Sequence, residues 1–283
     1  MKVSPIGAAD LADVGQFLHE HLNRRFTPEG WTSSVTHLWV ENAPNYGMQL
    51  RDGERLVGVF CATYSDQLID GQIERFCNPH SWCVLETHRQ HGIGLLLNLV
   101  KQRGYHFTMF TPNSKVAEIF LGLKFKNLDD RQYICLNLPS PVAWRRGVFV
   151  ESAPERIAAR LKGQDLRDFE AHQRIPWLNF VAFGSGDDVC WVVYKPTRWK
   201  RLRSAWLMHV SNADSFERLN GLLRNHLRRH HGIVTLKVEA RWLTAKPAWS
   251  LLERRTQPKL FKSPSLVDPQ VRDLYSELVA LDV

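Results

Sequence analysis

Several patterns that would assign a chemistry at once are missing from this 283-residue sequence. It has no Cys-x-x-Cys and no His-Glu-x-x-His pattern, so motif spacing gives a metal centre no support. It has neither the Gly-x-Gly-x-x-Gly pattern of a dinucleotide site nor the glycine-rich P-loop that ends in Gly-Lys-Ser/Thr. We therefore expect no metal and neither of these two nucleotide-binding loops.

Long apolar runs are missing as well. The first seven residues, Met1 to Gly7, do not form the apolar core of a signal peptide, and no run of eighteen apolar residues occurs. The five cysteines are odd in number, and most lie inside apolar runs, which is typical of buried, reduced thiols. The sequence thus predicts a cytoplasmic protein without a membrane partner.

The composition favours a globular chain with two hydrophobic cores. Apolar residues make up 44% and charged residues 23% of the sequence, and 283 residues can bury two cores of ordinary size. The net charge of +8 is uneven, since residues 1–139 carry about −1 and the remainder about +9. This asymmetry predicts an acidic partner for the second half, such as an acyl carrier protein or an anionic substrate.

One stretch carries most of the functional information. The apolar residues from Trp82 to Leu85 predict a strand, and Leu95 begins an apolar helix. The turn between them contains Gly92 and Gly94, which let a backbone turn sharply and leave amide groups uncovered. Amides at the start of a helix, together with the helix dipole, favour an anion such as a pyrophosphate, and Arg89 adds a positive charge.

The pattern Arg89-x-x-Gly92-x-Gly94 resembles the loop that binds the acyl-CoA pyrophosphate in the GNAT superfamily of N-acyltransferases. The run from Asn113 to Phe125 is similar to the next helix of that family. Two positions depart from the pattern, because Phe120 stands where the family has a tyrosine and Lys124 where it has a glycine.

The resemblance implies an α/β (α+β) GNAT fold, a mixed and mostly antiparallel splayed sheet flanked by helices. A strand, two helices, a meander with turns at Asp52-Gly53 and Asp70-Gly71, and strand–loop–helix–strand–helix follow in the family's order, with Gln132 to Leu138 as the last strand. The second of the two helices has an apolar stripe that includes Leu38.

The Pro139-Ser140-Pro141 stretch suits a linker, so we expect domains at 1–138 and 139–283. The second half repeats the order of elements and resembles a degenerate GNAT domain. It ends in a predicted helix from Asp268 to Leu281. Its loop, Asn212 to Arg218, has acids where the glycines should be and would repel a pyrophosphate.

The resemblance also implies which residues contact the donor. The pantetheine arm would pair with the backbone of the strand before the loop, and the pyrophosphate would lie on the loop amides. The expected acyl-CoA-binding residues are Cys83, Val84, Leu85, Arg89, Gln90, His91, Gly92, Ile93, Gly94 and Asn113. The alternative is a helix start in which the glycines serve only the geometry.

Direct attack on a thioester needs an uncharged amine, so a general base is expected. Glu74 is the first candidate, because family members often place a carboxylate on this strand, and His80 is the second. Glu74 could equally form an ion pair with Arg75 or Arg55. The family's general acid is missing at Phe120, and neither Tyr105 nor Cys83 is supported by spacing as a substitute.

We therefore expect a tandem GNAT-type N-acyltransferase that transfers an acetyl or other acyl group from acyl-CoA to an amine of a small-molecule acceptor. One alternative is an acyltransferase that uses aminoacyl-tRNA or an acyl carrier protein as donor, although the intact loop makes a nucleic-acid partner less expected. Another is a catalytically silent GNAT module that binds coenzyme A. RNA binding with a steep salt dependence would favour the first alternative.

Overall fold

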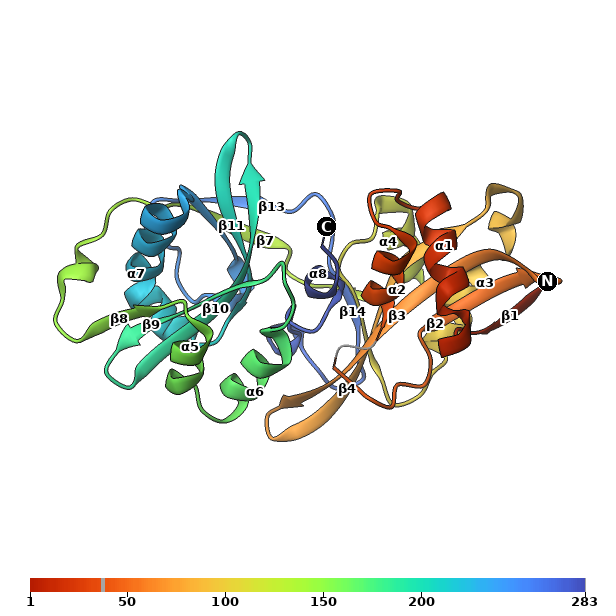
Figure 1. Ribbon diagram of the computed structural model, residues 1–283, viewed down its shortest axis with the longest axis horizontal. Helices are drawn as coiled ribbons and strands as arrows, with labels where there is room; N and C mark the ends of the chain where they lie inside the picture. The colour runs from red at the N-terminus through yellow and green to blue at the C-terminus, as the bar shows by residue number, and fades with distance from the viewer. Residues whose placement is uncertain (37–38, 283) are drawn as a thin grey trace.

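The computed structural model describes residues 1–36 and 39–282. Figure 1 shows an elongated molecule with two lobes, each built on a twisted sheet, and the C-terminal segment lies between them. Leu38, expected on a helical stripe, lies outside the described residues. Within the described part of the chain, no helix is long and apolar enough to cross a membrane.

The first lobe contains a seven-stranded sheet in the described part of the chain. Its neighbours are antiparallel except for β4 and β5, which run parallel. In spatial order the strands are β1 (Lys2–Pro5), β2 (Gly47–Asp52), β3 (Arg55–Ile69), β4 (Gln72–Val84), β5 (His106–Met109), β14 (Leu260–Lys262) and β6 (Lys126–Asn127). The predicted hairpin turns at Asp52-Gly53 and Asp70-Gly71 are both confirmed.

Alternate residues of β3 contact different helices, as the two-residue period of a strand requires. Val59 and Cys61 pack in one core with residues of α1 and α2, whereas Phe60 and Ala62 pack in another with residues of α3 and α4. Both faces of the sheet are therefore covered. The helices are α1 (Leu11–His21), α2 (Pro28–Val35), α3 (Ile93–Val100) and α4 (Ser114–Gly122).

The second lobe repeats this strand order. Its seven-stranded sheet again has one parallel pair, β11 with β12, in the position that β4 and β5 hold in the first sheet. In the corresponding order the strands are β8 (Val148–Glu151), β9 (Asn179–Ser185), β10 (Asp188–Trp199), β11 (Leu202–Val210), β12 (Thr235–Glu239), β7 (Arg131–Leu136) and β13 (Ser250–Arg254).

Helices cover this sheet too, and they are α5 (Pro154–Arg160), α6 (Gly163–His172) and α7 (Ala213–His231). The prediction of one long terminal helix is wrong. The segment forms a short 3-10 turn at Asp268–Gln270 and then α8 (Glu277–Ala280). Between them, Val271 has an extended backbone (φ −85°, ψ 115°), and its carbonyl oxygen accepts a hydrogen bond from Arg241 over 2.6 Å in place of a helical amide.

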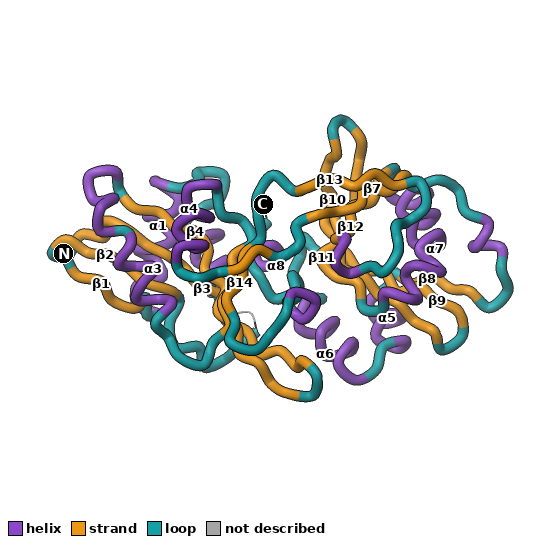
Figure 2. Tube along the Cα trace, turned by 180° about the vertical axis from the view of Figure 1, so that it is seen from behind, coloured by secondary structure: helices purple, strands orange, loops and turns teal. Residues whose placement is uncertain are grey.

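The two lobes exchange strands, which corrects one expectation. The segment Gln132–Leu138 was expected to complete the first sheet, but β7 pairs with β12 and β13 of the second. The corresponding place in the first sheet is taken by β14, which lies between β5 and β6. Figure 2 shows β14 crossing back toward the first lobe. The domain boundary at 138/139 stays a prediction. Each sheet takes one strand from across that boundary, β14 in the first sheet and β7 in the second.

Buried charges mark the place where the chain returns to the first lobe. Lys259, the residue before β14, is fully buried, and its ammonium lies 3.0 Å from the Glu239 carboxylate and in contact with Asp273. The Arg241 guanidinium donates to Asp273 over 2.7 Å. These residues come from the end of β12 and from the C-terminal segment. The charge cluster therefore ties three distant parts of the chain together.

Candidate functional site

The candidate site lies where β4 and β5 separate. The two strands are paired only at Phe76–His106 and Cys77–Phe107, although β4 continues for seven more residues. The Asn78 side chain still reaches the Thr108 carbonyl oxygen over 3.1 Å. Beyond that contact the facing backbone edges of the two strands are no longer joined as a ladder, which is the splay that the sequence analysis expected.

A β-bulge lies on the other edge of β4, just before the loop. Cys83 is opposite Val59 and His80 is opposite Cys61, so two residues of β4, Ser81 and Trp82, share one position of β3. Ser81 has a φ of 52°, in the left-handed region. A bulge breaks the ladder and bends the strand, and bulges are over-represented next to active sites. Here it changes the direction of the segment that contains Cys83 and Val84.

The loop itself is more helical than expected. After Leu85 a 3-10 helix spans Glu86–His91, and α3 begins at Ile93. Gly92 has φ −61° and ψ −34°, an ordinary right-handed helical conformation, so the expected use of glycine for a sharp turn is wrong there. Its lack of a side chain serves packing instead, because a Cβ would lie 3.2 Å from the Arg89 carbonyl oxygen.

Packing does not require the second glycine. A Cβ on Gly94 would lie 3.5 Å from the Val3 side chain of β1, which is ordinary van der Waals contact. Gln90 and His91 end the 3-10 helix, the Gly92 amide donates to the Arg89 carbonyl oxygen over 3.0 Å, and α3 begins at Ile93. The first amide groups of a helix have no partner within it, so Ile93 and Gly94 are the residues of this loop whose amides are best placed for an anion.

Two of the polar side chains predicted to contact the donor, Arg89 and Asn113, already have partners within the chain. The Arg89 side chain is 71% exposed and lies 3.5 Å from Glu86. The Asn113 side chain accepts a hydrogen bond from the Val116 amide at 3.0 Å and caps α4. Asn113 therefore has a structural role that sequence reasoning did not assign, and its contact with a donor stays a prediction.

Glu74 has a partner other than the two arginines considered. Its carboxylate lies 2.7 Å from Nε2 of His106, and Nδ1 of His106 lies 2.8 Å from the Ser263 hydroxyl. The Ser263 oxygen also accepts hydrogen bonds from the amides of Ser265 and Leu266. This chain of contacts connects β4, β5 and the segment after β14, and it fixes Glu74 in place.

His80 is buried, and both ring nitrogens have hydroxyl partners. Nε2 lies 3.1 Å from the Thr63 hydroxyl, and Nδ1 lies 3.0 Å from the Ser81 hydroxyl. Burial lowers the pKa of His80 to about 4. The ring is therefore neutral at pH 7 and takes up a proton only weakly, which makes it a poor general base.

Neither of the two substitutes considered from the sequence, Tyr105 and Cys83, is suited to replace the general acid that is missing at Phe120. Phe120 is fully buried and packs against Phe60 and Phe125. The Tyr105 hydroxyl is bound by Arg75, and burial raises its pKa. Burial raises the pKa of the Cys83 thiol to about 11, so this thiol gives up its proton reluctantly at neutral pH.

One carboxylate that sequence reasoning missed lies at the splay. Glu277, the first residue of α8, is buried and accepts hydrogen bonds on Oε1 from the Phe110 amide (2.9 Å) and the Thr111 hydroxyl (3.1 Å). Its own amide donates to the Asn78 side chain over 2.7 Å. It therefore connects residue 78 of β4 to the end of β5, the two sides of the gap.

The second oxygen of this carboxylate, Oε2, is buried and has no hydrogen-bond partner among the described residues. Burial raises the pKa of Glu277, although its hydrogen bonds act in the opposite direction. Nearly 200 residues separate Glu277 from Asn78, so no local pattern could have revealed it. Its only sequence signal is an acid that follows Ser276, a capping residue.

No protein-family model and no curated protein matches this chain. Several solved structures do match it. A GCN5-related N-acetyltransferase from Anabaena variabilis ATCC 29413 matches with a TM-score of 0.62 at 8% identity, over 92% of this chain and 72% of its own.

Two further structures are similar. A conserved Enterococcus faecalis V583 protein of unknown function, described as a probable N-acyltransferase, has a TM-score of 0.61 at 13% identity, over 95% of this chain and 73% of its own. A GCN5-related N-acetyltransferase from Kribbella flavida has a TM-score of 0.58 at 15% identity, over 92% and 70%. At such identities the likeness shows the fold alone. The chain has the fold of the GNAT acetyltransferases, with both lobes inside the matched region.

Proposed function

We propose that this protein is an N-acyltransferase that uses an acyl-CoA, with acetyl-CoA as the first candidate, and transfers the acyl group to the amine of a small molecule. The observation that carries the proposal is the end of the β4–β5 pairing after Cys77 and Phe107. The free end of β4 leads through the bulge into residues 85–94 and then into α3. An extended arm fits between two separating strands, and its phosphates fit at the start of the helix.

Different residues of the chain would bind the pantetheine arm and the pyrophosphate of the donor. The backbone of Cys83 and Val84 would pair with the amides of the pantetheine arm, because both backbone groups of Leu85 already have partners. The amides of Ile93 and Gly94, at the start of α3, would hold the pyrophosphate. Coenzyme A supplies the activated thioester and a thiolate leaving group. Arg89 would exchange its exposed contact with Glu86 for a phosphate oxygen.

Glu277 is the better candidate for the base that accepts the amine's proton. It lies at the splay, its Oε2 is free of hydrogen bonds within the described chain, and burial raises its pKa, so the carboxylate takes up a proton more readily than an exposed glutamate does. Glu74 and His80 remain candidates from the sequence, although His106 engages Glu74 and burial keeps His80 neutral. The amine would lose its proton to the carboxylate as it attacks the thioester carbon.

The basic second half supports an acidic partner or an anionic acceptor. Exposed cationic residues lie at the β10–β11 hairpin and at the end of α7, and Arg203 next to Gly232 connects the two places. The exposed cations are Arg198, Lys200, Arg201, Arg203, Arg228 and Arg229. Arg224 does not belong to this surface, because it is buried and donates to the backbone carbonyls of Leu136 and Ala248.

Calorimetric titration with acetyl-CoA tests the donor site. Gly92→Glu places a carboxylate at the helix start and should abolish binding, while Arg89→Ala should weaken it. Gly122→Glu is the matched control, because it adds the same charge at a helix end where a Cβ meets nothing within 4 Å. Binding that survives Gly92→Glu, or no binding of the wild type to any acyl-CoA, would contradict the donor site.

Thiol release with a panel of primary amines tests the chemistry. Glu277→Gln should keep acetyl-CoA binding and lower kcat with little change in KM, because the amide cannot take up the proton. Glu74→Gln is the comparison, since its carboxylate is held by His106. Equal loss in both variants would argue against Glu277 as the base. Coenzyme A binding without turnover on any amine would instead favour a silent binding module.

A further inference from the structure

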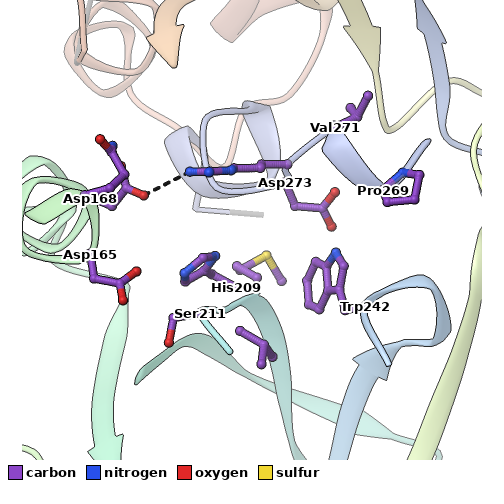
Figure 3. A pocket seen from close by; sticks show the side chains of 12 residues that line it. Asp165, Asp168, His209, Ser211, Trp242, Pro269, Val271 and Asp273 are labelled. Atoms are coloured by element: carbon purple, nitrogen blue, oxygen red, sulfur yellow. Dashed lines mark hydrogen bonds and ion pairs between the residues drawn. The ribbon is translucent and has the colours of Figure 1, made fainter. Parts of the chain in front are cut away.

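The second sheet also opens where its parallel strands separate. β11 and β12 are paired only from Ser204–Thr235 to Trp206–Lys237. Past that point a cavity of about 220 Å³ lies between the end of β11, the helix α6 and the C-terminal segment. Its lining includes Asp165, Asp168, His209, Ser211, Trp242 and Asp273, and Figure 3 shows Asp165 on one side, Trp242 on the other and His209 between them.

Most charges around this cavity are already balanced. Asp168 accepts hydrogen bonds from Arg272 (3.1 Å) and from the Tyr275 hydroxyl (2.6 Å). Asp273 is held by Arg241 and Lys259 in the buried charge cluster. Each of these carboxylates therefore has its cation within the protein, and neither needs one from a ligand.

Asp165 differs from them. Among the described residues it forms no ion pair, and although it is partly buried its side chain lines the cavity. Burial raises its pKa, the Trp191 indole lowers it as a hydrogen-bond donor, the charge of Asp168 raises it, and the charge of Arg272 lowers it. An ionised carboxylate in this position is costly unless a cation joins it. Arg272 lines the same cavity but forms its ion pair with Asp168, so among the described residues no cation pairs with Asp165 directly.

One buried polar atom beside Asp165, Nε2 of His209, has no hydrogen-bond partner among the described residues. The indole of the fully buried Trp191 acts as a donor toward Asp165. The two rings are neighbours, with centroids 4.6 Å apart. Burial, followed by the charge of Arg272, lowers the pKa of His209 to about 3, so its ring is neutral and can accept a hydrogen bond. Buried groups of this kind normally have partners, so Nε2 of His209 is open to a hydrogen-bond donor from a ligand.

We propose that this cavity binds a small ligand that carries a primary ammonium group. The ammonium would pair with Asp165 and donate to Nε2 of His209, and the ring of Trp242 would cover the ligand's carbon chain. Cavities for drug-sized ligands span about 300–1,000 Å³, so this smaller one suits a short amine. The proposal concerns the second lobe and does not depend on acyl-CoA binding in the first.

Nuclear magnetic resonance of the indole N–H groups tests it on the full chain. The probes are n-butylammonium chloride and 1-butanol, which has a similar chain without the charge, at matched ionic strength and pH 7. Trp191→Phe and Trp242→Phe assign the two signals. We expect saturable shifts of both signals with butylammonium and at least tenfold weaker binding of butanol. Equal responses to the two probes, or shifts that never saturate, would overturn the proposal.

Variants of α6 separate the site from a general charge effect. Asp165→Asn should weaken butylammonium binding at least tenfold, whereas Glu170→Gln, an exposed carboxylate of the same helix, should leave it unchanged. Asp165→Asn should also raise the urea midpoint at pH 7, because it removes a partly buried charge that forms no ion pair among the described residues. A lower midpoint would mean that Asp165 is a structural residue and would refute the assignment, and so would unchanged binding in Asp165→Asn.

Discussion

Replacing Lys259 by methionine should destabilise the protein strongly. The ammonium is fully buried and contacts the carboxylates of Glu239 and Asp273. Three cations and three carboxylates balance in this cluster, and they are Lys259, Arg241, Arg255, Glu239, Asp268 and Asp273. Methionine fills a similar volume, so the main change is one uncompensated buried negative charge.

The expected cost follows from that charge. Removing one partner of a buried ion pair typically lowers the free energy of unfolding by about 3–5 kcal/mol. Asp273→Asn should cost a similar amount, because it leaves one excess positive charge. The double variant restores the balance, so its loss should be smaller than the sum of the single losses by roughly 2 kcal/mol or more.

Urea unfolding followed by tryptophan fluorescence measures these free energies. Arg254→Met is the control, because the Arg254 side chain is 76% exposed in its ion pair with Asp130 and should contribute at most about 1 kcal/mol. The reasoning is refuted if Lys259→Met costs no more than this control. Strictly additive losses in the double variant would refute it as well, since they would mean that the cluster does not act as a unit.

Two further predictions concern a pair of glycines and a buried histidine. Gly15→Ala should lower the free energy of unfolding by roughly 1–3 kcal/mol, because a Cβ would lie 2.5 Å from the Pro28 carbonyl oxygen. Gly122→Ala should raise the free energy of unfolding by about 0.5–1 kcal/mol, because alanine has the higher helix propensity and a Cβ at this position has nothing within 4 Å. Thermal unfolding of both variants checks the opposite signs, and a stabilising Gly15→Ala would contradict the close approach of α1 and α2. The lowered pKa of His80, about 4 in the folded chain against about 6.5 unfolded, means that its contribution is complete above pH 6.5 and is lost as the pH falls toward 4. Between pH 7 and 5 the wild type should therefore lose about 2 kcal/mol more than His80→Gln in urea unfolding, and identical pH dependence of the two proteins would show that His80 is not held neutral.

Local patterns in the sequence predicted the elements whose causes are local. The Asp-Gly pairs at 52–53 and 70–71 make hairpin turns, and the apolar residues from Leu95 onward form most of α3. The burial of the free cysteines was predicted as well. Each depends on neighbours in sequence or on the hydrophobicity of a short run, so no distant contact was needed.

Tertiary structure decided what depends on distant contacts. The sequence patterns of β7 and β14 do not distinguish between the two sheets. Only the assembled lobes determine that β7 pairs with β12 and β14 with β5. Glu277 reaches the splay because its amide donates to Asn78, about 200 residues away in the sequence. Asp165 forms no ion pair among the described residues because Arg272, about 100 residues away, pairs with Asp168 instead. Such pairings depend on where the whole chain places its charges, and no window of sequence contains that information.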